Sequence, residues 1–460
     1  MAGVGFSLKA LRTDESYTGL IRLYGTAGII SSGPWLLSIL TLLFIGLIGR
    51  ELVTDPHDLS RFQVCVTWLF AASLLWTGPM QLMFTRFTAD REFLGEYDET
   101  LPNLFGALCV LGAATFAISI PLVALFQNST WTFKWILASA FVVLSQTWLV
   151  VIVLTGLRAH LAVFSCFALG YASTFVACLL LARFGQEGLL MGFVIGQATL
   201  LFSALCVLAR KLPAKSAVAF RFLERRSFYL ELGLVGLFYN LGVWIDKLIF
   251  WWGAGTGQRV LGPLRASEVY DLPIFLAYLT IVPGMAVFLV RVETDFAEAH
   301  REFYAAVRDG APLLRLEALC GNMTDAARRA VVDIVKIQGI TLIMCAALGP
   351  WLLSLAGISE LHLPLFYIDA AGVALQVILL AVTSMFFYLD RRRAVSVLTG
   401  LLLLSNAGFT WLSMRLGPDL YGYGFAMAMA VTSLLGLVLL SRTFSTLVRD
   451  TFMRQPVVAS

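Results

Sequence analysis

Charged residues are scarce in this sequence. Asp, Glu, Lys and Arg make up 13% of its 460 residues, whereas soluble domains carry about 25%. Hydrophobic residues fill 59% of the chain and stand in long runs. This composition excludes a soluble enzyme, a disordered chain and a secreted disulfide scaffold. A membrane β-barrel would alternate in segments of about ten residues, so the long runs exclude that class too.

Motifs for catalysis and metal binding are also missing. The seven cysteines include no C-x-x-C pair, and the four histidines (His57, His160, His300 and His362) have no neighbouring ligand set. No glycine-rich phosphate loop occurs. We therefore expect a protein that is not an enzyme and that holds neither a cofactor nor a metal ion.

Twelve apolar runs reach the roughly twenty residues that a helix needs to cross a bilayer. They cover residues 24–49, 62–85, 104–126, 135–157, 161–182 and 188–209, then residues 231–252, 267–290, 331–356, 364–389, 394–414 and 421–441. Most of the 33 Lys and Arg residues fall on the side of the membrane that holds both ends of the chain. The sequence thus predicts an all-α polytopic membrane protein with both termini in the cytoplasm.

Matching residues recur in the two halves of the span series. Gly33-Pro34-Trp35 in the first span corresponds to Gly242-Val243-Trp244 in the seventh, and Gly78-Pro79 in the second corresponds to Pro283-Gly284 in the eighth. Arg86 and Arg291 each precede an Asp by four residues at the ends of those helices. The pattern indicates two parallel six-helix lobes related by a pseudo-twofold axis along the membrane normal.

The expected domain order follows from the spans and the polar segments between them. Residues 1–22 form a cytoplasmic interfacial segment, residues 23–210 the N-lobe, and residues 211–230 a basic linker. Residues 231–460 form the C-lobe, which includes a polar excursion over residues 291–330 and a short C-terminal tail.

Proline breaks helices at Pro34, Pro79 and Pro283, and lipid cannot satisfy the carbonyl groups that such breaks free. Glycine in mid-span has a similar effect, and Gly242 marks such a break in the seventh span. The breaks in the first and seventh spans are therefore candidates for the wall of a watery cavity between the lobes. The candidate lining residues are Ser31, Ser32, Gly33, Pro34, Trp35, Tyr239, Asn240, Gly242, Trp244 and Asp246. Structural kinks that neighbouring helices fill would explain the same residues.

Within the seventh, eighth and tenth predicted spans lies a candidate cluster of four charged residues, Asp246, Lys247, Asp271 and Asp369. Each costs about 2.5–3.5 kcal/mol at the bilayer centre on insertion scales, so each requires a reason. Adjacent helix positions point about 100° apart, so we expect Lys247 to pair with Asp271 or Asp369 rather than with Asp246. The cluster is either an interhelical ion pair or the polar wall of a vestibule that contacts a substrate or a coupling cation.

The excursion over residues 291–330 is amphipathic and contains turn signals, which predicts a helical hairpin. Its apolar residues Phe296, Phe303, Val307, Leu314 and Leu316 are candidates for docking a cytoplasmic partner. The alternative is a hairpin that folds back on its own helix bundle.

Several short motifs resemble a known family. They are Gly3-Val4-Gly5-Phe6, Tyr24-Gly25, Ser32-Gly33-Pro34-Trp35 and the run from Asn240 to Lys247. They are similar to the PelG-like transporter subunits of bacterial Pel exopolysaccharide systems. The two-lobed plan resembles the multidrug/oligosaccharidyl-lipid/polysaccharide (MOP) flippase superfamily.

The resemblance implies export of an amino-sugar polymer across the bacterial inner membrane. It also implies assembly with PelD-like and PelE-like membrane subunits and a PelF-like cytoplasmic glycosyltransferase. Three other functions stay open on the sequence: a lipid-linked oligosaccharide flippase, a cation-coupled drug exporter, and an assembly scaffold with no transport path of its own.

Overall fold

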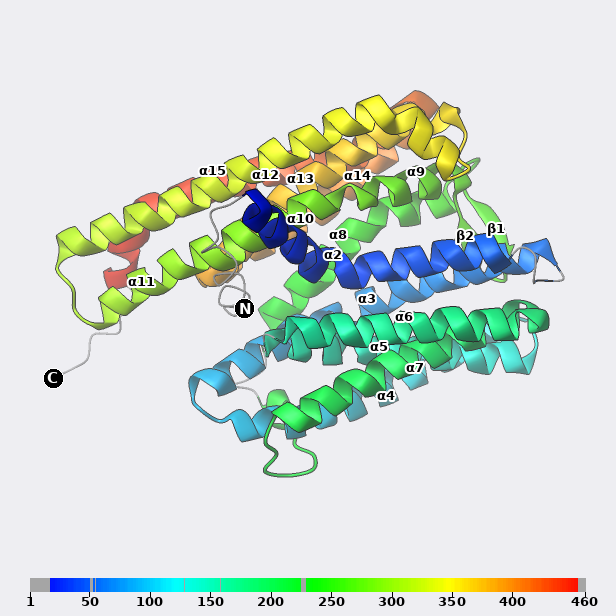
Figure 1. Ribbon diagram of the computed structural model, residues 1–460, viewed down its shortest axis with the longest axis horizontal. Helices are drawn as coiled ribbons and strands as arrows, with labels where there is room; N and C mark the ends of the chain where they lie inside the picture. The colour runs from blue at the N-terminus through cyan, green and yellow to red at the C-terminus, as the bar shows by residue number, and fades with distance from the viewer. Residues whose placement is uncertain are drawn as a thin grey trace. The chain divides into compact units, whose positions relative to one another are not determined.

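The computed structural model describes residues 17–49, 53, 55–127, 129–157, 159–224 and 229–453. Almost all of these residues are helical, and the one sheet among them is a two-stranded hairpin (Figure 1). The interfacial segment predicted at residues 1–22 lies largely outside the described residues. The all-α fold class predicted from the sequence is confirmed.

Each of the twelve predicted spans falls on a helix. The helices are α2 (Tyr17–Ile48), α3 (Pro56–Phe93), α4 (Thr100–Ala124), α5 (Trp131–Gly156), α6 (His160–Leu181), α7 (Gly185–Lys211), α8 (Leu230–Trp252), α9 (Glu268–Leu279), α10 (Ile281–Val290), α11 (Ala297–Arg308), α12 (Leu313–Leu355), α13 (Leu363–Tyr388), α14 (Arg392–Leu416) and α15 (Tyr423–Met453). Ten helical stretches of the described residues are long and apolar enough to cross a membrane. One of these stretches contains both α6 and α7, and the bent helix α2 forms a further span.

Local sequence signals set the helix ends. Asp55 caps α3 by accepting a hydrogen bond from the His57 N–H at 2.9 Å, and Thr130 caps α5 by accepting one from the Phe133 N–H at 3.1 Å. Gly185, at φ +66°, takes the left-handed conformation that turns the chain between α6 and α7. The eighth span breaks at Thr280 into α9 and α10, close to Pro283, whose ring and missing N–H disfavour a continuous helix there.

The chain forms two compact units, and their boundaries differ from the predicted lobes. Unit 1 contains residues up to Ser32 and from Val269 onward, and unit 2 contains residues Gly33–Glu268. Helix α8, expected in the C-lobe, therefore belongs with the helices of the first half, and α2 contributes to both units. The basic segment at 211–230 does not separate the units, because α7 and α8 on either side of it both lie in unit 2.

The basic segment is attached to the start of α4. Asn103 accepts a hydrogen bond from the Phe222 N–H at 3.3 Å, and Arg221 donates to the buried Glu99 carboxylate at 2.8 Å. Phe222 is buried in a core cluster of unit 2. Sequence reasoning treated this segment as a linker because its charges resemble those of a solvated loop, whereas its backbone and aromatic ring are fixed by α4.

Helices α3 and α8 of unit 2 approach each other through two glycines. A Cβ atom added at Gly78 would lie 2.9 Å from the Gly236 carbonyl oxygen, and one added at Gly236 would overlap the Gly78 carbonyl. The Asn240 amide donates to the Gly236 carbonyl at 2.9 Å and lies against Gly78. Only residues without side chains allow two helix backbones to approach so closely.

A polar contact ties the N-terminal end of α8 to the C-terminal part of α3. The Tyr229 hydroxyl donates to Asp90 at 2.6 Å, and this hydrogen bond raises the pKa of Tyr229. Arg86 pairs with Asp90 at 3.0 Å and lies over the Tyr229 ring. Helices α3 and α8 are therefore held together at the N-terminal end of α8 as well as at Gly78 and Gly236.

In unit 1 the first part of α2 packs against α10. Leu23 and Ala27 share a buried cluster with Ala286, Leu289 and Val290. The first helix of one half of the sequence thus packs on the second helix of the other half, and α8 on α3 is the reciprocal case. The two matched Arg-x-x-x-Asp motifs also form equivalent ion pairs, since Arg291 lies 2.9 Å from Asp295.

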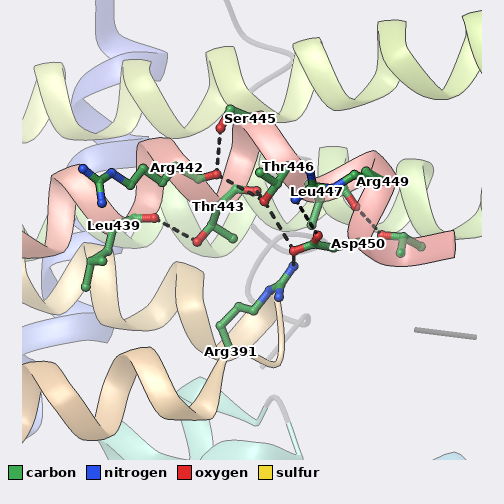
Figure 2. A network of polar contacts seen from close by, with 10 residues as sticks. Arg391, Leu439, Arg442, Thr443, Ser445, Thr446, Leu447, Arg449 and Asp450 are labelled. Atoms are coloured by element: carbon green, nitrogen blue, oxygen red, sulfur yellow. Dashed lines mark hydrogen bonds and ion pairs between the residues drawn. The ribbon is translucent and has the colours of Figure 1, made fainter. Parts of the chain in front are cut away.

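The polar excursion is continuous with the spans on either side. Helix α10 runs through the π-helical turn η5 (Arg291–Phe296) into α11, and α12 begins at Leu313 and continues as the ninth span. Figure 2 shows how α15 is tied to the turn before α14: Arg391 reaches Asp450 at 2.9 Å, and the Thr446 hydroxyl donates to the same carboxylate.

Substitution of Gly236 tests the helix crossing. We expect Gly236→Ala to destabilise the protein by about 1–3 kcal/mol, because the added methyl group must displace the α3 backbone. Thermal unfolding in detergent measures this effect. Gly339→Ala is the matched control, since no described atom lies within 4 Å of a Cβ added there. Equal stability of the two variants would contradict the close approach.

Candidate functional site

The polar residues predicted at the helix breaks are divided between the two units. Ser31 and Ser32 belong to unit 1, and the remaining candidates belong to unit 2. The Ser31 hydroxyl donates to the Gly28 carbonyl at 3.3 Å and lies 3.4 Å from the Ser32 hydroxyl. Ser32 is buried and Ser31 is half-buried. The side chain of Trp35 lies outside the described part of the structure.

Helix α8 holds most of the candidate residues of unit 2. Tyr239, Asn240 and Trp244 are half-buried, and Gly242 is buried. The amide of Asn240 is occupied at the crossing with α3, so this side chain has a packing role. Pro79 lies within an uninterrupted α3 next to the same crossing, whereas α2 is bent beside Pro34.

The expectation that Lys247 would not pair with Asp246 was wrong. The Lys247 ammonium nitrogen lies 3.0 Å from the Asp246 carboxylate and donates to the Val243 carbonyl at 3.1 Å. The two positions do point in different directions on the helix, but the flexible four-carbon stem of lysine curls back along α8 and brings the charges together. Both residues are buried, and the ammonium lies 5.8 Å from the Trp244 ring centroid.

The other two charged residues of the predicted cluster lie in unit 1. Asp369 of α13 is fully buried, and Asp271 of α9 is half-buried. Gly422, which takes a positive φ of 84°, lies beside the Asp369 carboxylate. The pair Asp246–Lys247 lies on α8 of unit 2.

The predicted docking residues of the excursion are mostly inaccessible to a partner. Phe296, Phe303 and Leu316 are buried and Val307 is half-buried, whereas Leu314 is 80% exposed. The apolar face of the hairpin therefore folds onto its own bundle, which is the alternative that the sequence left open. The amphipathic pattern indicated an apolar face correctly but could not identify the surface that covers it.

Two residues that the sequence analysis did not select stand out. Glu293 is buried in η5 and accepts a hydrogen bond from the Tyr388 hydroxyl at 2.7 Å. Trp68 of α3 contacts the rings of Trp251 and Trp252 at the end of α8. No local pattern pointed to either residue, because their partners lie 95 or more positions away in the chain. Among the described residues, no group of three or more His, Cys, Asp or Glu could hold a metal ion.

The buried pair Asp246–Lys247 predicts a characteristic double-mutant result. Asp246→Asn or Lys247→Met alone should destabilise the protein by about 3–5 kcal/mol, because each removes one member of a buried ion pair and keeps the charge of the other. Combining the two should recover most of the loss. Thermal unfolding of the three variants in detergent measures this coupling. Additive losses in the double variant would show that the pair is not coupled.

Comparisons with known proteins place these features in a family. A family model described as "PelG: Putative exopolysaccharide Exporter (EPS-E)" matches residues 1–452. No curated protein matches the chain.

Solved structures share the fold at low sequence identity. An outward-facing multidrug resistance MATE family transporter of the MOP superfamily aligns with TM-score 0.64 and 15% identity, covering 92% of this chain and 96% of that one. An inward-facing structure of such a transporter gives 0.64 and 13%, covering 90% and 96%. A MOP superfamily transporter from Pyrococcus furiosus Vc1, described with a binding pocket of reversed polarity, gives 0.63 and 16%, covering 92% and 96%. The chain therefore has a MOP transporter fold and belongs to the PelG exopolysaccharide exporter family.

Proposed function

We propose that the protein moves an amino-sugar exopolysaccharide from the cytoplasm to the periplasm along a path lined by α2 and α8. The match to an exopolysaccharide exporter family over nearly the whole chain supports the substrate class. The MOP transporter fold supports a role in transport. The path through the protein, the amino-sugar chemistry of the polymer and the direction of transport are what the proposal adds to these findings.

The composition of α8 is the main observation that supports the proposed transport path. Within one membrane-spanning helix it presents the half-buried Tyr239 and Trp244 together with the buried pair Asp246–Lys247. A span that faced lipid all round would not carry these groups, because each polar group must find a partner away from water. Hydroxyl and aromatic groups are suited to a sugar, whose edges form hydrogen bonds and whose ring faces are apolar.

The ion pair argues against a cation-coupled drug exporter that depends on Asp246. A carboxylate 3.0 Å from an ammonium group is already neutralised, so a coupling cation would first have to displace Lys247. The pair instead keeps α8 polar without leaving a net charge in the membrane. The transported polymer would meet a polar but electrically balanced helix.

The proposal includes assembly with a cytoplasmic glycosyltransferase of the PelF-like class and with PelD-like and PelE-like membrane subunits. The tip of the α11–α12 hairpin is the proposed contact for the glycosyltransferase. Leu313 and Leu314 at this tip are 58% and 80% exposed, and they follow a turn at Gly310 with φ +68°. Exposed leucines beside Arg308, Asp309 and Arg315, which together leave one net positive charge, suit a mixed apolar and acidic partner surface.

A bulky side chain on α2 tests the path. We expect Ser31→Trp to reduce secreted polymer by roughly tenfold, equivalent to about 1.4 kcal/mol, because the indole would narrow the path. Immunodetection of secreted polysaccharide measures the effect, and co-purification of the partner subunits verifies assembly. Ile343→Trp is the control, since Ile343 is 71% exposed on α12, a helix whose membrane-spanning part is mostly exposed. Normal secretion by an assembled Ser31→Trp complex would favour the scaffold function.

The hairpin tip is tested by Leu313→Glu combined with Leu314→Glu. We expect the variant to lose co-purification of the glycosyltransferase while its thermal stability stays within about 0.5 kcal/mol, as is usual for surface substitutions. A deletion of the excursion would be less informative because it would expose the buried Phe303 and Leu316. Unchanged co-purification would exclude the tip as the docking site.

A further inference from the structure

Four tryptophans of unit 2 form one connected series along α8 and α3. The Trp244 and Trp251 ring centroids lie 6.2 Å apart, and Trp251 lies 4.6 Å from Trp68. Trp68 in turn meets Trp252 edge-to-face, with ring centroids 5.2 Å apart. The series therefore extends from the ion pair on α8 to the C-terminal end of that helix.

The hairpin that follows α8 holds this series in place. Its strands β1 (Gln258–Leu261) and β2 (Leu264–Ala266) are antiparallel and come directly after the end of α8 (Figure 1). The Trp68 indole N–H donates to the Arg265 carbonyl at 2.8 Å, and the Thr256 hydroxyl donates to the Phe250 carbonyl at 2.8 Å. Because the polar edge of Trp68 is bonded to β2, its orientation is fixed before any ligand arrives.

The four rings differ in accessibility in a way that suits a binding platform. Trp251 is 1% exposed and forms the backing of the series, whereas Trp252 is 55% exposed and Trp68 and Trp244 are half-buried. Three rings are thus accessible in part; the buried Trp251 packs on Trp244 and Trp68, and Trp68 packs on Trp252. Ligand sites are commonly built in this way, from mostly apolar and aromatic walls with a few placed polar groups.

Other exposed tryptophans of the chain show what a simple interfacial anchor looks like. Trp131 is 73% exposed, and the Lys134 ammonium nitrogen of the same helix lies 4.8 Å from its ring centroid. Trp411 is 55% exposed and contacts Arg415 in the same way, at 5.2 Å. Each of these rings pairs with a cation one turn away, as expected at a headgroup layer. The series on α8 and α3 instead joins indole to indole across two helices.

The charges around the series select among sugars. At its inner end Lys247 and Asp246 form an ion pair, the two strands contribute Arg259 and Arg265, and the exposed Glu268 follows β2, which leaves one net positive charge. A protonated amino sugar would meet net positive charge here, whereas a neutral N-acetylated sugar would not. The ring faces offer stacking, and the guanidinium groups can donate hydrogen bonds to hydroxyl and acetyl oxygens.

We propose that Trp244, Trp68 and Trp252, backed by Trp251, form a binding site for neutral N-acetylhexosamine units of a polysaccharide. The inference rests on the proposed function, because it assumes that this polymer passes α8. It adds to that function a site at the end of α8 and a preference for acetylated over charged units.

Binding of a short soluble N-acetylhexosamine oligosaccharide to the purified full-length protein tests the site. Isothermal titration calorimetry should give a dissociation constant about tenfold higher for Trp252→Ala than for the unaltered protein, and a value within about threefold for Trp252→Phe, which keeps a ring. Trp131→Ala is the matched control and should bind normally. Equal loss in Trp131→Ala, or none in Trp252→Ala, would overturn the site.

The deacetylated, positively charged oligosaccharide tests the charge preference, and it should bind more weakly than the acetylated one. Equal or tighter binding would overturn the preference. Different results would refute the binding site and the transport path. Unchanged binding in Trp252→Ala together with blocked secretion in Ser31→Trp would refute the site alone. Normal secretion by Ser31→Trp together with weakened binding in Trp252→Ala would refute the path alone.

Discussion

The close approach of α3 and α8 at Gly78 and Gly236 determines where the functional groups of unit 2 lie. With no side chain at either position, the two backbones come near enough for Asn240 to lie against Gly78. The same approach sets the distance at which Trp68 of α3 meets Trp251 and Trp252 of α8. A bulkier residue at the crossing would separate the helices and so move every polar and aromatic group of α8 relative to α3.

The crossing also explains why the compact units differ from the two halves of the sequence. Helix α8 packs on α3, and the first part of α2 packs on α10, so the first helix of each half packs with the second helix of the other. The chain passes from one unit to the other at Ser32–Gly33 and at Glu268–Val269. Gly33 stands directly before Pro34, where a helix can bend at low cost. The ion pairs Arg86–Asp90 and Arg291–Asp295 are the remaining trace of the internal match.

The fold could be predicted from the sequence because a long apolar run has few alternatives in a bilayer. Every predicted span lies on a helix, and Pro283 stands close to the break between α9 and α10. Side-chain partners were harder to predict. The direction of a helix position does not fix where the end of a lysine lies, so Lys247 pairs with its neighbour Asp246. An amphipathic pattern does not identify the covering surface, so Phe296 and Phe303 are buried instead of facing a partner. Trp68 could not be selected because its contacts join distant parts of the chain.

Photocrosslinking from Tyr239 in cells that secrete the polymer tests the proposed path most directly. A photoreactive residue at this half-buried position of α8 should give a covalent adduct between the protein and the polysaccharide, detected with an amino-sugar-specific lectin. The same residue at Ile343, exposed on α12, should give no adduct. If the Tyr239 variant still supports secretion but forms no polymer adduct, or if Ile343 forms as much, the polymer does not pass along α8.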